Sequence, residues 1–88
     1  MVRGPEQYAQ DWIKMGIKLE KEMKYEKAED AFRKAIKYKP DLAKAWMHLG
    51  LVLGKLGKTT EAEDATSKAI ELDPSIAVEG KRRTEKIL

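Results

Sequence analysis

Apolar and small residues recur along this chain at steps of three and four, the spacing of one face of an α-helix. One such series contains Trp12, Met15, Gly16 and Leu19, and lysine and glutamate occupy most of the positions between such residues. The pattern predicts amphipathic helices. We expect them at about residues 6–22, 25–38, 42–56, 60–72 and 76–88.

The pattern also repeats. Residues 9–42 align with residues 43–76 without a gap and are identical at 14 of 34 positions. A period of this length is typical of a solenoid, in which each unit buries its apolar face only against its neighbours. Most solenoids bind other proteins, so the repeat favours an interaction module as the class of function.

Local signals indicate where the helices turn. Gly57 is suited to a left-handed cap at a helix C-terminus, and Pro40 and Pro74 end the second helix of each unit. Thr60 and Glu63 have the spacing of a capping box, which predicts that Thr60 begins the fourth helix.

Two glycines lie in the middle of predicted helices, where each costs about 1 kcal/mol relative to alanine. Gly16 and Gly50 occupy equivalent positions in the two units, so a packing reason is expected. We predict that Ala28 and Ala62 face them from the second helix of each unit and allow the two backbones to approach closely.

The residues at these fixed offsets resemble the tetratricopeptide repeat. The first unit carries the match at Trp12, Met15, Gly16, Leu19, Tyr25, Ala28, Phe32, Ala35 and Pro40. The second unit carries it at Trp46, Leu49, Gly50, Leu53, Ala62, Ala69 and Pro74. The resemblance implies an all-α fold: a right-handed α-solenoid of two antiparallel helix-turn-helix repeats with a solvating fifth helix. Three positions depart from the family pattern, namely Met23, Thr59 and Thr66, and they predict a less tightly packed second hairpin.

A single domain is expected over residues 1–88, with repeats at 9–42 and 43–76 and a cap helix at 77–88. The cap would turn Gly80, Thr84 and Ile87 inward and keep its basic residues elsewhere. Such a cap is needed because the last repeat would otherwise leave its apolar face in water. Two hairpins and a cap fall below the three repeats usually required, so a homodimer is a further possibility.

Composition narrows the class of protein further. Charged residues make up 38% of the chain but the net charge is only +3, so most charges offset one another on solvated helix faces. The chain has no cysteine, which excludes a disulfide framework and favours a cytoplasmic setting. No apolar run is long enough to span a membrane, and no cofactor is expected.

In tetratricopeptide proteins the first helix of each unit lines a concave groove, and the resemblance implies that ligand contacts arise there. The corresponding positions in this chain are Gln10, Ile13, Lys14, Ile17, Lys21, Lys44, Met47, His48, Leu51 and Lys55. Ile13 and Ile17 are four residues apart, as are Met47 and Leu51, so each pair lies on one helix face. These four would form an apolar strip edged by lysines, although they could instead complete the helix packing.

Some members of the family hold acidic C-terminal tails of chaperones with a clamp of lysine, asparagine and arginine. Arg82 is the one clamp residue retained here. The other clamp positions hold Ile13, Ile17, His48 and Val78. A two-carboxylate clamp is therefore not expected, although Lys44, His48 and Arg82 could hold one carboxylate. The expected ligand is a peptide or amphipathic helix with apolar anchors and acidic residues.

Other classes of function fit less well. The basic residues 81–83 are compatible with nucleic-acid binding. However, acidic residues occur in most of the predicted helices, and no aromatic residue is free to stack on bases. Trp12 and Trp46 are expected in the core. No nucleophile, base and orienting group can be assembled into an active site, and the single histidine, His48, has no evident companion. The chain is therefore not expected to be an enzyme.

Self-association is the strongest alternative to groove binding. It would proceed by end stacking or by exchange of the C-terminal helix between copies, and it predicts contacts at residues 76–88 and on the exposed side of 60–72. Groove binding instead predicts contacts at Ile17, Met47 and Leu51.

Overall fold

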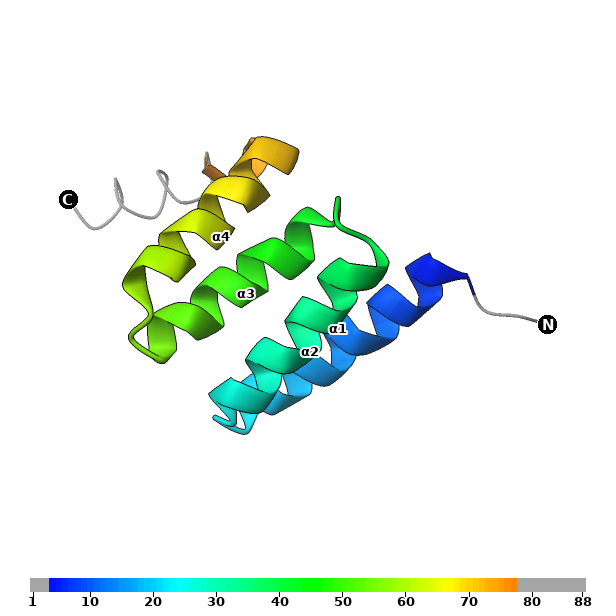
Figure 1. Ribbon diagram of the computed structural model, residues 1–88, viewed down its shortest axis with the longest axis horizontal. Helices are drawn as coiled ribbons and strands as arrows, with labels where there is room; N and C mark the ends of the chain where they lie inside the picture. The colour runs from blue at the N-terminus through cyan, green and yellow to red at the C-terminus, as the bar shows by residue number, and fades with distance from the viewer. Residues whose placement is uncertain (1–3, 78–88) are drawn as a thin grey trace.

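The computed structural model describes residues 4–77, and these residues form helices and turns without a β-strand. The four helices are α1 (Pro5–Lys21), α2 (Tyr25–Tyr38), α3 (Ala43–Lys55) and α4 (Thr59–Leu72). α1 and α2 form an antiparallel first hairpin, and α3 and α4 form the second (Figure 1). The all-α prediction is confirmed, and each of these helices begins and ends within one residue of its predicted bounds. Residues 75–77 begin another helical turn, whereas the rest of the expected cap helix, including Arg82, lies outside the described residues.

One continuous apolar core joins the two hairpins. α3 lies between α2 and α4 in the fold (Figure 1) and contributes the most apolar sequence of the four helices. Its buried side chains include Leu49, Val52 and Leu53, each at most 1% exposed. They meet Phe32 of α2, which is fully buried, in the same cluster. Burying one such side chain stabilises the fold by about 1.5–3 kcal/mol, so α3 is the element that couples the hairpins.

The mid-helix glycines do allow close helix contact, but one of the predicted partners is wrong. A Cβ atom built on Gly16 would lie 2.6 Å from the Phe32 ring, so Phe32 and not Ala28 requires that glycine. A Cβ atom on Gly50 would lie 2.5 Å from the hydroxyl of Thr66 and 3.3 Å from the backbone oxygen of Ala62. The aromatic ring of the first hairpin is thus replaced by a short polar side chain in the second.

The two hairpin turns share one backbone shape. Gly57 has a φ of +78°, which confirms the predicted left-handed cap, and Met23 at the equivalent position has a φ of +62°. The predicted capping box is wrong because α4 begins one residue earlier, at Thr59, with Lys58 as its N-cap. The backbone N–H of Lys58 donates to the carbonyl of Leu53 at 2.9 Å, so the turn itself sets where α4 begins.

Both tryptophans are partly buried and pack against the core at its edge, and each makes a second contact. The ammonium group of Lys34 lies 4.5 Å from the centre of the Trp12 ring. The indole N–H of Trp46 donates to the carbonyl of Pro40 at 2.7 Å and so ties α3 to the loop that connects the hairpins.

Candidate functional site

The first helices of the two hairpins meet at His48. Its Nδ1 atom lies 3.2 Å from Oε1 of Glu20 on α1, and both side chains are mostly buried. The His48 ring also stacks on Phe32 of α2, with ring centres 5.3 Å apart and planes inclined by 17°. The sequence does not indicate this pair, since Glu20 and His48 become neighbours only when one hairpin stacks on the other. His48 of the second hairpin therefore contacts two residues of the first hairpin, Glu20 and Phe32.

The expected apolar strip is shorter than four residues. Ile13 is 1% exposed and belongs to the core that also contains Leu49, so the expectation that it faces a ligand is wrong. The physical reason is that Ile13 lies in the apolar cluster that residues of both hairpins form together. Ile17 is partly buried against the same core, one turn further along α1.

On α3 the equivalent positions are more open. Leu51 is 52% exposed, the largest exposed fraction of any apolar side chain on this helix, and Met47 one turn earlier is half-buried. Lys44 and Lys55 are exposed at the two ends of the same helix face, and Lys14 and Lys21 are exposed on either side of Ile17. Gln10 is half-buried. Of the four residues in the expected strip, Ile17 and Met47 are thus partly accessible and Leu51 is exposed.

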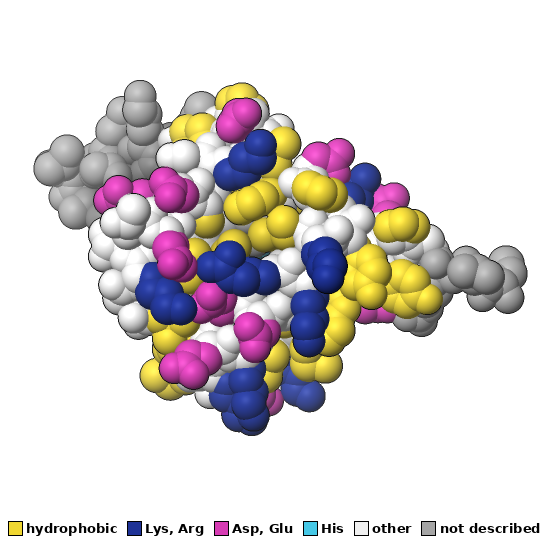
Figure 2. Space-filling view, in the orientation of Figure 1, with side chains coloured by type: hydrophobic (Ala, Val, Ile, Leu, Met, Phe, Trp, Pro, Cys, Tyr) yellow, Lys and Arg dark blue, Asp and Glu magenta, His cyan; other side chains and the backbone are white. Residues whose placement is uncertain are grey.

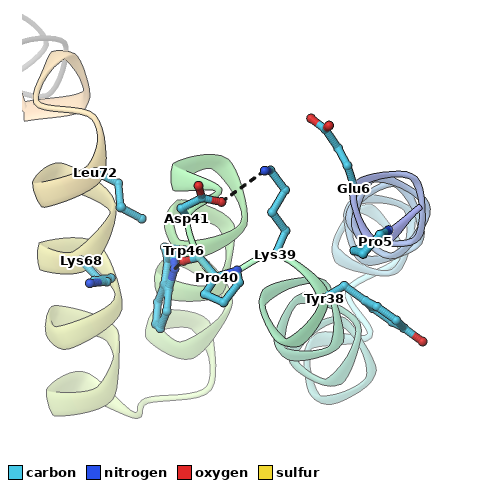
Figure 3. Close-up of a pocket in the computed structure, with 9 residues that line it drawn as sticks. All are labelled: Pro5, Glu6, Tyr38, Lys39, Pro40, Asp41, Trp46, Lys68 and Leu72. Atoms are coloured by element: carbon cyan, nitrogen blue, oxygen red, sulfur yellow. Dashed lines mark hydrogen bonds and ion pairs between the residues drawn. The ribbon is translucent and has the colours of Figure 1, made fainter.

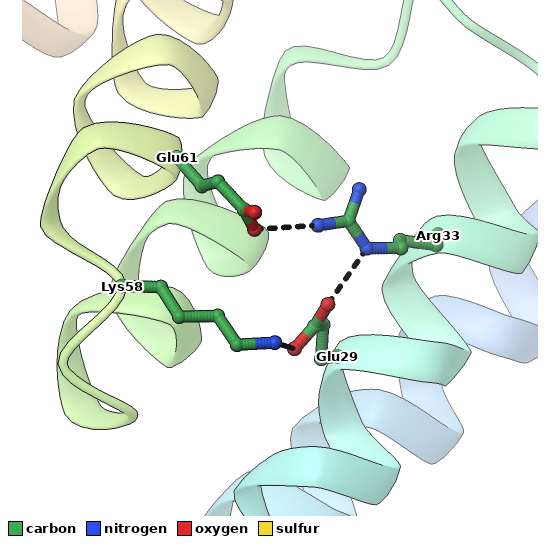
Figure 4. Close-up of polar contacts among 4 residues, drawn as sticks. All are labelled: Glu29, Arg33, Lys58 and Glu61. Carbon is green, nitrogen blue, oxygen red and sulfur yellow. Dashed lines mark hydrogen bonds and ion pairs between the residues drawn. The ribbon is translucent and has the colours of Figure 1, made fainter.

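A chain of ion pairs joins the hairpins on α2 and α4, and it involves none of the expected ligand contacts. The Glu29 carboxylate accepts hydrogen bonds from Nε of Arg33 at 2.8 Å and from Nζ of Lys58 at 3.1 Å (Figure 4). Arg33 also donates to Glu61 of α4 at 3.2 Å. No Cα atom of α2 lies within 8 Å of α4 among the described residues, so these side chains bridge the two helices.

The environment of Glu29 favours its ionised form. Its side chain is 12% exposed. Burial opposes ionisation, but the hydrogen bonds and positive charges of Arg33 and Lys58 outweigh that effect, so the pKa of Glu29 lies below its usual value of 4.5. A carboxylate held in this way stabilises the joint and is unsuited to proton transfer near neutral pH.

A hollow of about 660 Å³ lies elsewhere, beside the loop between the hairpins (Figure 3). It is lined by Pro5, Glu6, Tyr38, Lys39, Pro40, Asp41, Trp46, Lys68 and Leu72. Lys39 and Asp41 pair with each other there at 3.5 Å. The lining comes from helices and a loop distant in the sequence, which is why the repeat pattern does not predict it.

Charge does not gather into one sign on the face of the molecule seen in Figure 2. Basic and acidic side chains are interspersed there, with apolar side chains showing between them. Within residues 4–77 no three histidine, cysteine or carboxylate side chains group as metal ligands. None of the described helices is both long and apolar enough to cross a membrane.

Family models agree with this architecture. A tetratricopeptide repeat model matches residues 43–76, and a second TPR repeat model matches residues 24–57. Together the two matches span residues 24–76, which is more than half of the chain, and they cross the joint between the hairpins. The chain belongs to the tetratricopeptide repeat family. Tetratricopeptide repeats generally mediate protein–protein interaction and are a scaffold rather than a catalytic fold. No curated protein matches the chain.

Proposed function

We propose that this protein is an interaction module that binds a peptide or an amphipathic helix across α1 and α3. The observation that carries the proposal is the exposure of Leu51, which is 52% accessible although it lies on the helix that couples the hairpins. A large apolar side chain in that position adds nothing to the core, whereas an apolar ligand side chain packed on it would remove it from water.

The neighbours of Leu51 support a small apolar contact surface. Met47 lies one turn earlier on the same face of α3, and its unbranched side chain adapts to partners of varied shape. The contact between Glu20 and His48 joins α1 to α3. Ile17 lies one turn before Glu20 on α1, and we infer that it faces the same side as Met47 and Leu51. The patch is therefore built from two helices of two hairpins.

The lysines at the margin of the patch favour a ligand with negative charge. Four exposed lysines flank the apolar residues: Lys14, Lys21, Lys44 and Lys55. A ligand with acidic residues beside its apolar anchors would meet these lysines, and Arg82 is proposed to contribute from beyond the described residues. A groove formed by two hairpins buries no more than about 800 Å² on each partner, so we expect modest affinity. We propose a cytoplasmic protein partner, and neither nucleic acid nor a membrane as a ligand.

The test uses a synthetic 18-residue helix with leucine at i, i+3, i+4 and i+7 and glutamate at most other positions. Amide NMR spectra of the full chain should shift at Ile17, Met47 and Leu51 on titration with this peptide. Leu51→Glu should weaken binding at least about tenfold, because it places a carboxylate in the apolar patch and repels the acidic ligand. Met15→Glu is the matched control, since Met15 is 46% exposed and lies outside the patch.

Two outcomes would contradict the proposal. One is a Leu51→Glu variant that binds the peptide as tightly as the unaltered chain. The other is a set of amide shifts that avoids α1 and α3. Helical circular dichroism of each variant shows that the change in binding does not come from unfolding.

A further inference from the structure

The joint between the hairpins shows how this scaffold receives another helix. α3 turns Ala45, Leu49 and Val52 inward, and each is at most 1% exposed. Its His48 ring stacks on Phe32 of the first hairpin. Beside this apolar contact, Glu29 of the first hairpin takes a lysine from the second. The face of the first hairpin that α3 packs on thus combines the aromatic ring of Phe32 with the carboxylate of Glu29, which binds Lys58.

The repeat places an equivalent face at the far end of the second hairpin, which we call the end face. Its residues are Gly54, Thr59, Ala62, Glu63, Thr66 and Ser67, and they line a hollow of about 330 Å³. Thr66 stands where the first hairpin has Phe32, and Gly54 stands where it has Glu20. The hollow therefore lies at the place of the missing aromatic ring, which a side chain from another helix can fill.

The end face is also acidic. α4 carries four acidic residues and one lysine. Glu63 stands where Glu29 stands in the first hairpin, and it is exposed. Within residues 4–77 no cation pairs with Glu63, whereas Glu29 holds both Arg33 and Lys58. A helix that docks here would gain from a basic residue, the opposite of the charge expected of a ligand on the lysine-edged patch.

The residues that directly follow α2 and α4 have the same backbone conformation. The residue after α2, Lys39, has φ −146° and ψ 93°, and the residue after α4, Asp73, has φ −143° and ψ 92°. In the register of α3, however, residues 78–88 carry Glu79, Arg83 and Lys86 at the positions of its three buried apolar residues. Burying these charges without partners would be costly, so the sequence of this segment does not favour it as the occupant of the end face in that register.

A second copy of the chain also fits poorly. In the first hairpin the positions equivalent to Ala45, Leu49 and Val52 hold Asp11, Met15 and Lys18. Head-to-tail stacking would therefore press a polar helix face onto the hollow. A symmetric pair would bring two acidic α4 helices together, which like-charge repulsion disfavours.

We propose that the end face binds an amphipathic helix of another protein, which lies as α3 lies on the first hairpin. The bound helix places a large apolar or aromatic side chain in the hollow above Thr66 and a basic residue beside Glu63. It supplies in trans the third layer of helices that two hairpins lack.

The test exploits the match in size at the hollow. The probes are two synthetic peptides that copy residues 42–56 of this chain, one unchanged and one with His48→Phe, titrated into the full-length protein. The His48→Phe peptide should bind at least about tenfold more tightly, because its ring fills the space that Thr66 leaves. A third peptide with Leu49→Glu should bind at least about tenfold more weakly than the unchanged peptide, because it brings a carboxylate to a face that is already acidic.

The Thr66→Phe variant of the protein should reverse this preference. Its ring can lie over Gly50 as Phe32 lies over Gly16, so the hollow closes and the unchanged peptide becomes the better ligand. Amide shifts should centre on Gly54, Ala62 and Thr66. Thr66→Phe should leave binding of the acidic peptide at Leu51 intact, which separates this site from the lysine-edged patch.

Several results would overturn the proposal. One is that neither copied peptide binds the full chain, and another is that both bind with the same preference before and after Thr66→Phe. Binding that appears only when the chain ends at residue 77 would assign the end face to residues 78–88. Shifts at Gly54 and Thr66 on concentrating the protein alone would assign it to a second copy.

Discussion

The two hairpins share a backbone and differ in what they can bind. The first hairpin buries Phe32 completely, and the ring reaches both Gly16 beneath it and His48 of the next unit. The second hairpin has an exposed Thr66 at that position. The residues that are identical in the two repeats maintain the helices. The residues that differ, such as Phe32 and Thr66, distinguish the interface between the hairpins from the end face.

The starting and finishing faces of the array differ in the same way. Asp11, Met15 and Lys18 give the outer face of α1 a polar character that suits solvent. The finishing face of the second hairpin instead has a hollow and an unpaired carboxylate among the described residues. Within the described residues, the outer face of α1 is therefore the more polar of the two, and the end face is the one for which we propose a bound helix.

The largest expected effect tests whether Phe32 is the residue that joins the hairpins. Phe32→Ala should cost about 3–5 kcal/mol of unfolding free energy, because it leaves a cavity under both Gly16 and His48. Thr66→Ala in the second hairpin should cost less than about 1 kcal/mol, since that side chain is exposed. Urea unfolding followed by circular dichroism measures both. Equal losses in the two variants would show that the two hairpins are energetically alike.

Much of this difference can be read from the sequence. The period and the helix bounds follow from local spacing, and the hollow in the second hairpin follows from Thr66 replacing an aromatic residue. The burial of Ile13 does not follow, because it depends on a core that both hairpins form together, and the periodicity within one helix contains no information on that packing. The pair of Glu20 and His48 is hidden for the same reason: the two residues are 28 positions apart and meet only after the hairpins stack.

An intermediate effect is expected at the two equivalent turns. Met23 has a positive φ, a conformation that costs a residue with a side chain about 1–2 kcal/mol. Met23→Gly should therefore raise the unfolding free energy by about 0.5–1 kcal/mol after the entropy of the more flexible unfolded chain is subtracted. Gly57→Ala at the equivalent position should lower it by about 1 kcal/mol. The same sign of change in both variants would contradict a shared left-handed turn.

The smallest effect separates the two equivalent carboxylates. Glu29 is paired with Arg33 and Lys58, and its pKa lies below the usual 4.5, so it binds its proton more weakly in the folded state than in the unfolded state. Its contribution to stability is therefore present above pH 4.5 and is lost as the pH falls through the lowered pKa. We expect about 1 kcal/mol or less, because Arg33 and Lys58 are themselves about half exposed.

Glu29→Gln should remove that contribution at pH 7 and flatten the pH dependence of unfolding below 4.5. Glu63→Gln is the matched control, since Glu63 occupies the same repeat position without a cation among the described residues, and it should lower the unfolding free energy at pH 7 less than Glu29→Gln does. Carboxyl NMR titration of the unaltered chain should accordingly place the pKa of Glu29 below its usual value of 4.5. If Glu29 instead titrated at its usual value, the ion pairs that bridge α2 and α4 would not persist in solution, and the difference between the two hairpins would rest on Phe32 alone.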